Sequence, residues 1–328
     1  MLKFVWSTLA ACAVALAGIP ALAEDYIDPQ LPKYRAINKL EGKLTLVGSQ
    51  TMSEVVALWE DRFTSFYPDV DVEVVVKGAS NAVPAVISGE ANIGLLSRET
   101  LIEEVEEFKK AKGYEPKILT PSLERIAVDV NESNPIESLT LAQLDAIFSK
   151  TLKRGEPKEI TTWGALGASG SLADQMITLK GRSDTTGSQV FFKSIAMNGG
   201  EFRAGISAEK DNLALVKAIR DDKNAIGFAG QMWQINGIKP VSLSWKAGET
   251  AYTVDSVGDE NGTYPLVRPL QFVINQAPDK DLGPIEVEFL RYVFSDMGQE
   301  DVVKAGFHPI SAEPAKTALG AVGLQTLN

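Results

Sequence analysis

The sequence predicts an α/β protein of two domains joined by a two-strand hinge, with a ligand held in the cleft between the domains. Strand and helix patterns alternate along most of the 328 residues, which favours mostly parallel sheets covered by helices on both faces. Two long apolar strand segments, 124–131 and 265–274, bracket a middle block. Three polar turns follow predicted strands, at the carboxyl ends where such folds bind ligands.

The order of the elements predicts the domain boundaries. In the first block, strands at 44–47, 72–76 and 93–96 alternate with helices at 52–66, 80–88 and 100–112. The middle block holds a helix at 140–148, a strand at 176–179, helices at 187–197 and 213–219, and a strand at 225–229. After the strand at 265–274, helix 284–296 and a C-terminal helix or two close the chain. We expect a discontinuous first domain, 24–128 plus 268–328, and an inserted second domain, 129–267.

The first 23 residues are typical of a secretory signal peptide. Lys3 is followed by the apolar segment 4–17 and by the small-residue cleavage site at 21–23, so the exported chain would begin at Glu24. A rival interpretation is a lipoprotein box at 9–12, with Cys12 as the lipidated residue. It would leave an apolar new N-terminus after an unusually short leader, so we expect soluble export to the periplasm. No other apolar stretch approaches the ~20 residues of a membrane span.

Composition excludes several function classes. Cys12 is the only cysteine, so the exported chain would have no thiol for catalysis, disulfides or zinc–thiolate binding. The formal net charge of −11 argues against nucleic acid and anionic membrane surfaces as partners. It does not exclude an anionic ligand, because screening over ~8 Å makes the local field of a cleft more important than the total charge.

The turn at 181–188, GRSDTTGS, is the strongest functional signal. It joins the strand at 176–179 to the helix at 187–197. The first turn of a helix has free backbone N–H groups and a partial positive charge. Hydroxyl groups and the guanidinium of Arg182 beside those N–H groups make a site for an anion.

Two further turns repeat this pattern in the first domain. The segments 48–52, GSQTM, and 78–81, GASN, each lie between a predicted strand and a predicted helix. One such turn could be ordinary helix capping by Ser or Thr. Three of them, one with Arg182, favour a shared oxyanion site between the domains.

These three turns resemble those of the periplasmic phosphate-binding proteins that feed ABC-type phosphate importers. The segments 139–149 with Trp163-Gly164, and 264–270, resemble that family too, so the likeness covers most of the mature chain. It implies a periplasmic-binding-protein-like fold, phosphate as ligand, ABC permease subunits as partners, no cofactor or metal, no enzymatic activity and a monomeric state. The implied phosphate contacts are Thr51, Met52 through its backbone N–H, Ser80, Arg182, Thr186, Gly187 through its backbone N–H, and Ser188.

The chain departs from the best-known family members at Ser97-Arg98. Those members have Ser-Asp there, and the Asp accepts a proton from the ligand. Arg98 would instead be a second charged contact, and sulfate would be rejected less strongly unless Asp184 or Glu99 takes over. We expect Asp184 to orient Arg182 through a bidentate pair, because a carboxylate facing an anion is repelled.

Other functions stay open at this point. Sulfate, arsenate or a phosphorylated solute could replace phosphate. A phosphatase with a Ser or Thr nucleophile would need a base or metal to activate the hydroxyl. His308 is the only histidine, and it lies far in the sequence from all three turns. We expect it to be structural.

Overall fold

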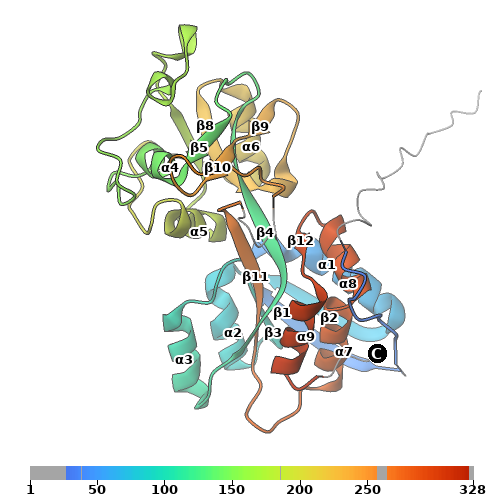
Figure 1. The fold of residues 1–328 in the computed structure, drawn as a ribbon. Helices are drawn as coiled ribbons and strands as arrows, with labels where there is room; N and C mark the ends of the chain where they lie inside the picture. Colours follow the sequence, from blue (N-terminus) through green and yellow to red (C-terminus); the bar gives the residue numbers. More distant parts are fainter. Residues whose placement is uncertain (1–26, 38, 185, 257–263, 325–328) are drawn as a thin grey trace, which may run out of the picture.

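The computed structural model describes residues 27–37, 39–184, 186–256 and 264–324, which form two lobes of helices and strands (Figure 1). The predicted signal peptide, with Cys12, lies outside the described residues. The α/β fold class predicted from the sequence is confirmed. Within the described part of the chain, none of the helices is both long enough and apolar enough to cross a membrane.

The lower lobe in Figure 1 is built on three parallel strands, in the order β2–β1–β3. Both faces of this sheet are covered, because Leu46 packs into one hydrophobic cluster and its neighbour Val47 into another. The bounds are β1 Glu41–Gly48, β2 Asp69–Val76, β3 Ile93–Leu96, α1 Ser53–Phe66, α2 Ala82–Ser88, α3 Ile102–Lys112, α7 Pro284–Val293, α8 Asp296–Lys304, β12 His308–Pro309 and α9 Ala312–Ala321.

The upper lobe contains the strands β8, β6 and β7 and a small separate sheet of β5 and β10. Its core includes three mutually packed phenylalanines, Phe148, Phe192 and Phe228, from two helices and a strand. The bounds are β5 Ser138–Thr140, α4 Leu141–Phe148, β6 Thr178–Gly181, α5 Gly187–Ile195, β7 Ser207–Ala208, α6 Asn212–Asp221, β8 Ala225–Gly230, β9 Ile238–Pro240 and β10 Ser242–Ser244. Short 3-10 turns occupy Gln50–Met52, Ala79–Asn81, Trp163–Leu166, Gly170–Leu172 and Gln231–Trp233.

Two antiparallel strands run from one lobe to the other. β4, Lys117–Asn131, pairs with β11, Val267–Ile274, over its first part and with β8 over its last part. The sheet is therefore continuous between the lobes, in the order β2-β1-β3-β11-β4-β8-β6-β7. The domain boundaries predicted at 128/129 and 267/268 fall on these strands and stay a prediction.

β4 carries a buried carboxyl group near its end. The Asp129 side chain is fully buried, and its Oδ1 accepts a hydrogen bond from Gln234 Nε2 at 2.8 Å. Its Oδ2 is buried without a partner among the described residues. Burial raises the pKa of Asp129 to about 7, and the Gln234 hydrogen bond opposes the shift only in part.

Asp129 should make the folded protein less stable as the pH rises. Between its unfolded pKa of about 4 and its folded pKa of about 7, the folded state holds a proton that the unfolded state releases. The free energy of unfolding should then fall by up to ~1.4 kcal/mol per pH unit across this window. Urea unfolding at pH 5 and pH 7 measures the slope. In Asp129→Asn the slope should be smaller, and an unchanged slope in that variant would exclude Asp129 as its source.

Candidate anion-binding site

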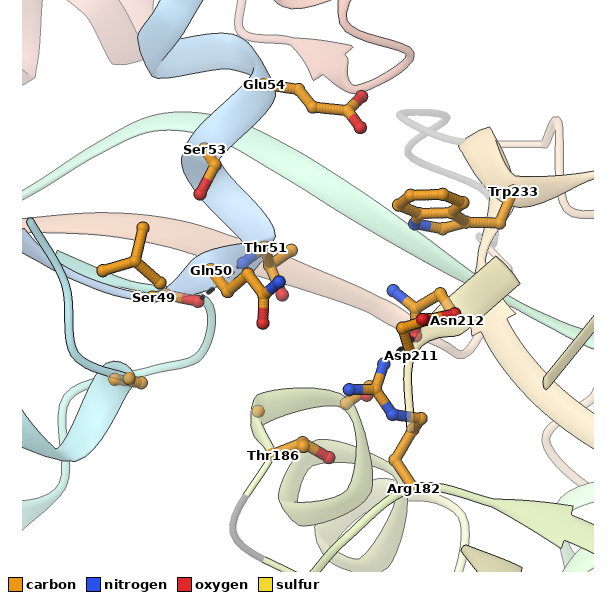
Figure 2. A pocket seen from close by; sticks show the side chains of 15 residues that line it. Ser49, Gln50, Thr51, Ser53, Glu54, Arg182, Thr186, Asp211, Asn212 and Trp233 are labelled. Atoms are coloured by element: carbon orange, nitrogen blue, oxygen red, sulfur yellow. Dashed lines mark hydrogen bonds between the residues drawn. The ribbon is translucent and has the colours of Figure 1, made fainter. Parts of the chain in front are cut away.

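A cavity of about 450 Å³ lies between the two lobes (Figure 2). One lobe contributes the ends of β1 and β2 and the start of α1. The other contributes the start of α5 and the segment before α6. The lining residues are Ser49, Gln50, Thr51, Ser53, Glu54, Val76, Gly78, Ala79, Arg182, Thr186, Gly187, Ser188, Asp211, Asn212 and Trp233.

Backbone hydrogen bonds hold the ends of β1, β2 and β3 together on the side of the cavity that holds Ser49 and Thr51. The carbonyl of Gly48 accepts from the N–H groups of Lys77 and Gly78, at 3.1 and 2.9 Å, and Ser49 N–H donates to Leu95 O at 2.9 Å. Gly48 has a φ of 150°, and a Cβ there would collide with the backbone of Leu95. Only glycine allows β1 to turn this close to β3.

Thr51 lies in the turn that starts after Gly48. Its N–H donates to Ser49 Oγ at 3.2 Å, so Ser49 caps the 3-10 turn Gln50–Met52 that leads into α1. This capping turns the Thr51 side chain toward the cavity (Figure 2). The sequence predicted Thr51 as a contact but did not distinguish Ser49, which also lines the cavity.

The start of α5 forms the opposite side. Thr186 is the N-cap residue, and its Oγ1 donates to Ser183 O at 2.9 Å. Gly187 and Ser188 follow as the first helical residues and line the cavity. First-turn N–H groups have no partner within the helix, and the helix dipole adds partial positive charge there. This end of α5 is therefore suited to an anion.

Arg182 is held by two groups of its own lobe. Its Nη1 donates to Asn212 Oδ1 at 2.7 Å and its Nη2 to Lys210 O at 3.2 Å. Its Nε is buried without a hydrogen-bond partner among the described residues. Burial lowers the pKa of Arg182, and the charge of Asp211 opposes this shift. A guanidinium stays protonated in proteins, so Arg182 supplies a positive charge to the cavity.

The expected Arg182–Asp184 pair is replaced by these contacts. Asp184 is exposed and borders a separate hollow with Gln189 and Lys193. Asn212, which begins α6, holds Arg182 instead.

Five of the eight residues predicted as ligand contacts line the cavity: Thr51, Arg182, Thr186, Gly187 and Ser188. Met52 is fully buried in the hydrophobic core, and its N–H donates to Ser49 O at 3.3 Å. Ser80 is exposed and lies beside the cavity-lining residues Gly78 and Ala79. Their ligand contacts stay predictions.

Arg98 is placed differently from the sequence-based expectation. Its Nη1 and Nη2 donate to the two carboxylate oxygens of Glu104 at 2.9 and 2.7 Å, and Nη1 also donates to Glu99 O. Glu104 Oε2 in addition accepts from the N–H of Leu101, the N-cap of α3. Arg98 therefore anchors the start of α3 and is not among the cavity-lining residues.

This placement gives a testable expectation for Arg98. Arg98→Gln should destabilise the fold by roughly 1–3 kcal/mol, because the part-buried Glu104 loses its charged partner and keeps only the Leu101 N–H. Its affinity for the anion should stay within about twofold, since no charge-assisted hydrogen bond to the ligand is lost. Thermal unfolding and calorimetric titration of the same sample measure both. A large loss of affinity with unchanged stability would restore Arg98 to the ligand site.

Several lining residues were not found from the sequence. Asp211 caps α6 through its Oδ1, which accepts from Ala214 N–H at 2.7 Å. Glu54 and Trp233 also line the cavity and lie above Thr51 and Thr186 in Figure 2. The sequence at Asp211 and Asn212 indicates only the start of a helix. No local pattern predicts that Trp233 lines the cavity.

Comparisons with known proteins identify the family of the chain. The model of the PBP superfamily domain matches residues 35–297. The phosphate-binding protein PstS of Pseudomonas aeruginosa is 35% identical over 317 residues, which cover 96% of this chain and 98% of that protein. PstS of Bacillus subtilis is 27% identical over 64% of this chain and 67% of its own length.

Solved structures show the same fold. A Clostridium perfringens protein solved with bound phosphate has a TM-score of 0.65 and 22% identity, and the match covers 82% of this chain and all of that one. An ABC-type phosphate transport receptor from Vibrio cholerae has a TM-score of 0.65 and 19% identity over the same shares. The chain belongs to the PBP superfamily and, within it, to the family of the phosphate-binding protein PstS.

Proposed function

We propose that this protein captures inorganic phosphate in the cavity between its two domains and delivers it to an ABC importer. It acts as a monomeric binding protein in the periplasm, after removal of the signal peptide predicted at residues 1–23. It is a carrier and not an enzyme, and it needs no cofactor or metal. The proposed ligand contacts are Thr51, Arg182, Thr186, Gly187 and Ser188, with Met52 N–H and Ser80 available if the turns at 48–52 and 78–81 move on binding.

The observation that carries this proposal is the meeting of two kinds of anion donor in one cavity. Arg182 and the start of α5 come from one lobe, and the hydroxyl-bearing turn with Thr51 comes from the other. Phosphate accepts hydrogen bonds on all its oxygens, and charge-assisted bonds of this kind are the strong ones. An anion that contacts both lobes would favour their closure about β4 and β11.

The names of the relatives support the same ligand and location. The P. aeruginosa relative is named a phosphate-binding protein, and the V. cholerae structure is described as a phosphate transport receptor. Another solved relative is described as a high-affinity periplasmic phosphate-binding protein, with a TM-score of 0.59. Capture outside the cytoplasmic membrane and transfer to a permease follow from this role.

A hydrolase is a poorer fit to the cavity. Nucleophilic catalysis by Thr or Ser requires an adjacent base. His308 lies on β12 beside β4, not among the cavity-lining residues, and burial lowers its pKa to about 4. Thr186 Oγ1 already donates to Ser183 O. Binding without turnover is the simpler function for these groups.

Selectivity against sulfate depends on a carboxylate that can accept a hydrogen bond from a protonated phosphate oxygen. Asp184 is turned away from the cavity and Arg98 is paired with Glu104. The carboxylates that do line the cavity among the described residues are Glu54 and Asp211. Asp211 lies beside Arg182 (Figure 2) and is our candidate acceptor, so rejection of sulfate should weaken in Asp211→Asn.

Calorimetric titration of extensively dialysed protein with phosphate, sulfate and methylphosphonate tests the proposal. Phosphate should bind at one site per chain, and the other two anions more weakly. Incubation with a phosphomonoester should release no phosphate. Absence of phosphate binding would contradict the proposed function. Steady release of phosphate from the ester would indicate a hydrolase instead.

A further inference from the structure

A second arginine, Arg268, lies behind the cavity on the crossing strand β11. Its side chain is almost fully buried, with 1% of its surface exposed. Its Nε donates to Glu124 Oε2 at 2.7 Å, and its Nη2 forms an ion pair with the same oxygen at 2.5 Å. Glu124 is the residue directly opposite on β4. Burial raises the pKa of Glu124, and the charge and hydrogen bonds of Arg268 oppose that shift.

One donor group of Arg268 is left over. Nη1 is buried and has no hydrogen-bond partner among the described residues. Leaving a buried charged donor unpaired is costly, so such groups call for a specific explanation. The Glu124 pair fixes the other two nitrogens, and the ring of Phe191 on α5 lies 5.8 Å from the guanidinium carbon. The orientation of Nη1 is therefore set by its surroundings.

Nη1 is directed at the start of α5. A Cβ built on Gly187 would lie 3.2 Å from Arg268 Nη1 and would collide with Ser97 Oγ. Ser97 Oγ in turn accepts a hydrogen bond from Ser49 Oγ at 2.9 Å. Gly187 and Ser49 both line the cavity. The unpaired nitrogen thus lies next to Gly187, a residue of the cavity lining, although Arg268 is not itself among the lining residues.

We propose that Arg268 is a second guanidinium contact of the bound anion, with Nη1 as the donor and Glu124 as the group that positions it. This inference rests on the proposed function and names a residue of the same site. It assigns to Arg268 the role of second cation that the sequence favoured for Arg98. Because Arg268 and Glu124 lie on the two crossing strands, the anion would contact the hinge itself as well as both lobes.

A second fixed positive charge should favour dianionic over monoanionic phosphate. The charged groups around the anion are Glu54, Arg182 and Asp211 in the cavity lining, and Glu124 beside Arg268. The double substitution of Arg268 and Glu124 leaves Glu54, Arg182 and Asp211 in place. A change in the pH dependence of affinity between variants therefore reports on the Arg268–Glu124 pair.

The test uses paired substitutions, because Arg268→Gln alone would leave Glu124 buried and unpaired. Glu124→Gln keeps the cation and removes the carboxylate, so its phosphate affinity is the reference for the double variant. Glu124→Gln combined with Arg268→Gln removes both charges and should lower phosphate affinity by roughly tenfold or more, the loss of one charge-assisted hydrogen bond. Titrations at pH 8 and pH 5.5 should give a smaller ratio of affinities in the double variant than in Glu124→Gln.

Arg62→Gln is the matched control. Arg62 on α1 pairs with the buried Asp301 and with Glu300, away from the cavity, so this change perturbs stability without touching the site. If the double variant binds phosphate as tightly as wild type, with the same pH ratio, Arg268 is not a ligand contact. That result would leave the proposed function intact, whereas a wild-type protein that fails to bind phosphate would overturn the function itself.

Discussion

Arg182→Ala should weaken phosphate binding by ~10²-fold or more, because each charge-assisted hydrogen bond to the anion contributes about 1.5–3 kcal/mol. Arg182 lines the cavity with its guanidinium already oriented by Asn212 and Lys210. The melting temperature of the ligand-free protein should change little. Arg182→Lys should recover only part of the affinity, since a point charge cannot reproduce the planar fork. Calorimetric titration measures both variants.

Arg203→Ala is the matched control for this result. Arg203 lies in the same lobe, is half-buried, and donates to Ile160 O at 3.3 Å, but it does not line the cavity. Arg203→Ala should change the melting temperature as little as Arg182→Ala does, and should leave phosphate affinity unchanged. Normal phosphate binding by Arg182→Ala would remove Arg182 from the site.

Gly187→Ala should abolish tight phosphate binding while leaving the fold intact. Gly187 starts α5 in one lobe, and a Cβ there would collide with Ser97 Oγ of the other lobe. The backbone of Gly187 is not in the left-handed region, so alanine itself is tolerated there. The added methyl group therefore acts on the approach of the two lobes. We expect a loss of ~10²-fold or more in affinity, comparable with the cost of a misplaced donor set.

Gly320→Ala provides the control for the substitution itself. Gly320 lies in α9, far from the cavity lining, and a Cβ there meets nothing within 4 Å. Alanine should stabilise the helix by roughly 0.5–1 kcal/mol and leave phosphate binding as in wild type.

Small-angle scattering of Gly187→Ala with phosphate should show a more open shape than wild type. Equal affinity and equal shape would show that Ser97 moves aside.

The fold could be predicted well where the signal was local. The helices expected at 52–66 and 187–197 begin at Ser53 and Gly187, where polar turns precede apolar periodic runs, although neither N-cap residue caps its helix with its side chain. The strand expected at 124–131 begins at Lys117. Its first part pairs with β11 and, at Ser122 and Leu123, with β12, and both partners are distant in the sequence. The short strands β5, β7, β9 and β10 have two or three residues each and leave no period to detect.

The site could be predicted where one turn held several donors and not where donors came from separate strands. Thr51, Arg182, Thr186, Gly187 and Ser188 lie in two such turns and line the cavity. Arg98 has the sequence context of a site residue, but Glu104 is six positions away and takes up its guanidinium. Arg268 on β11 lies next to Gly187 on α5, although the two residues are 81 positions apart in the sequence. The local sequence around Arg268 does not predict its proximity to Gly187.

The most direct test of phosphate capture between the lobes is a crystal structure of dialysed protein grown with stoichiometric phosphate. We predict a single tetrahedral anion in the cavity, within hydrogen-bond distance of Thr51 from one lobe and of Arg182 and Gly187 N–H from the other. Density for the anion bound to one lobe alone, or outside the cavity lined by these residues, would contradict the account.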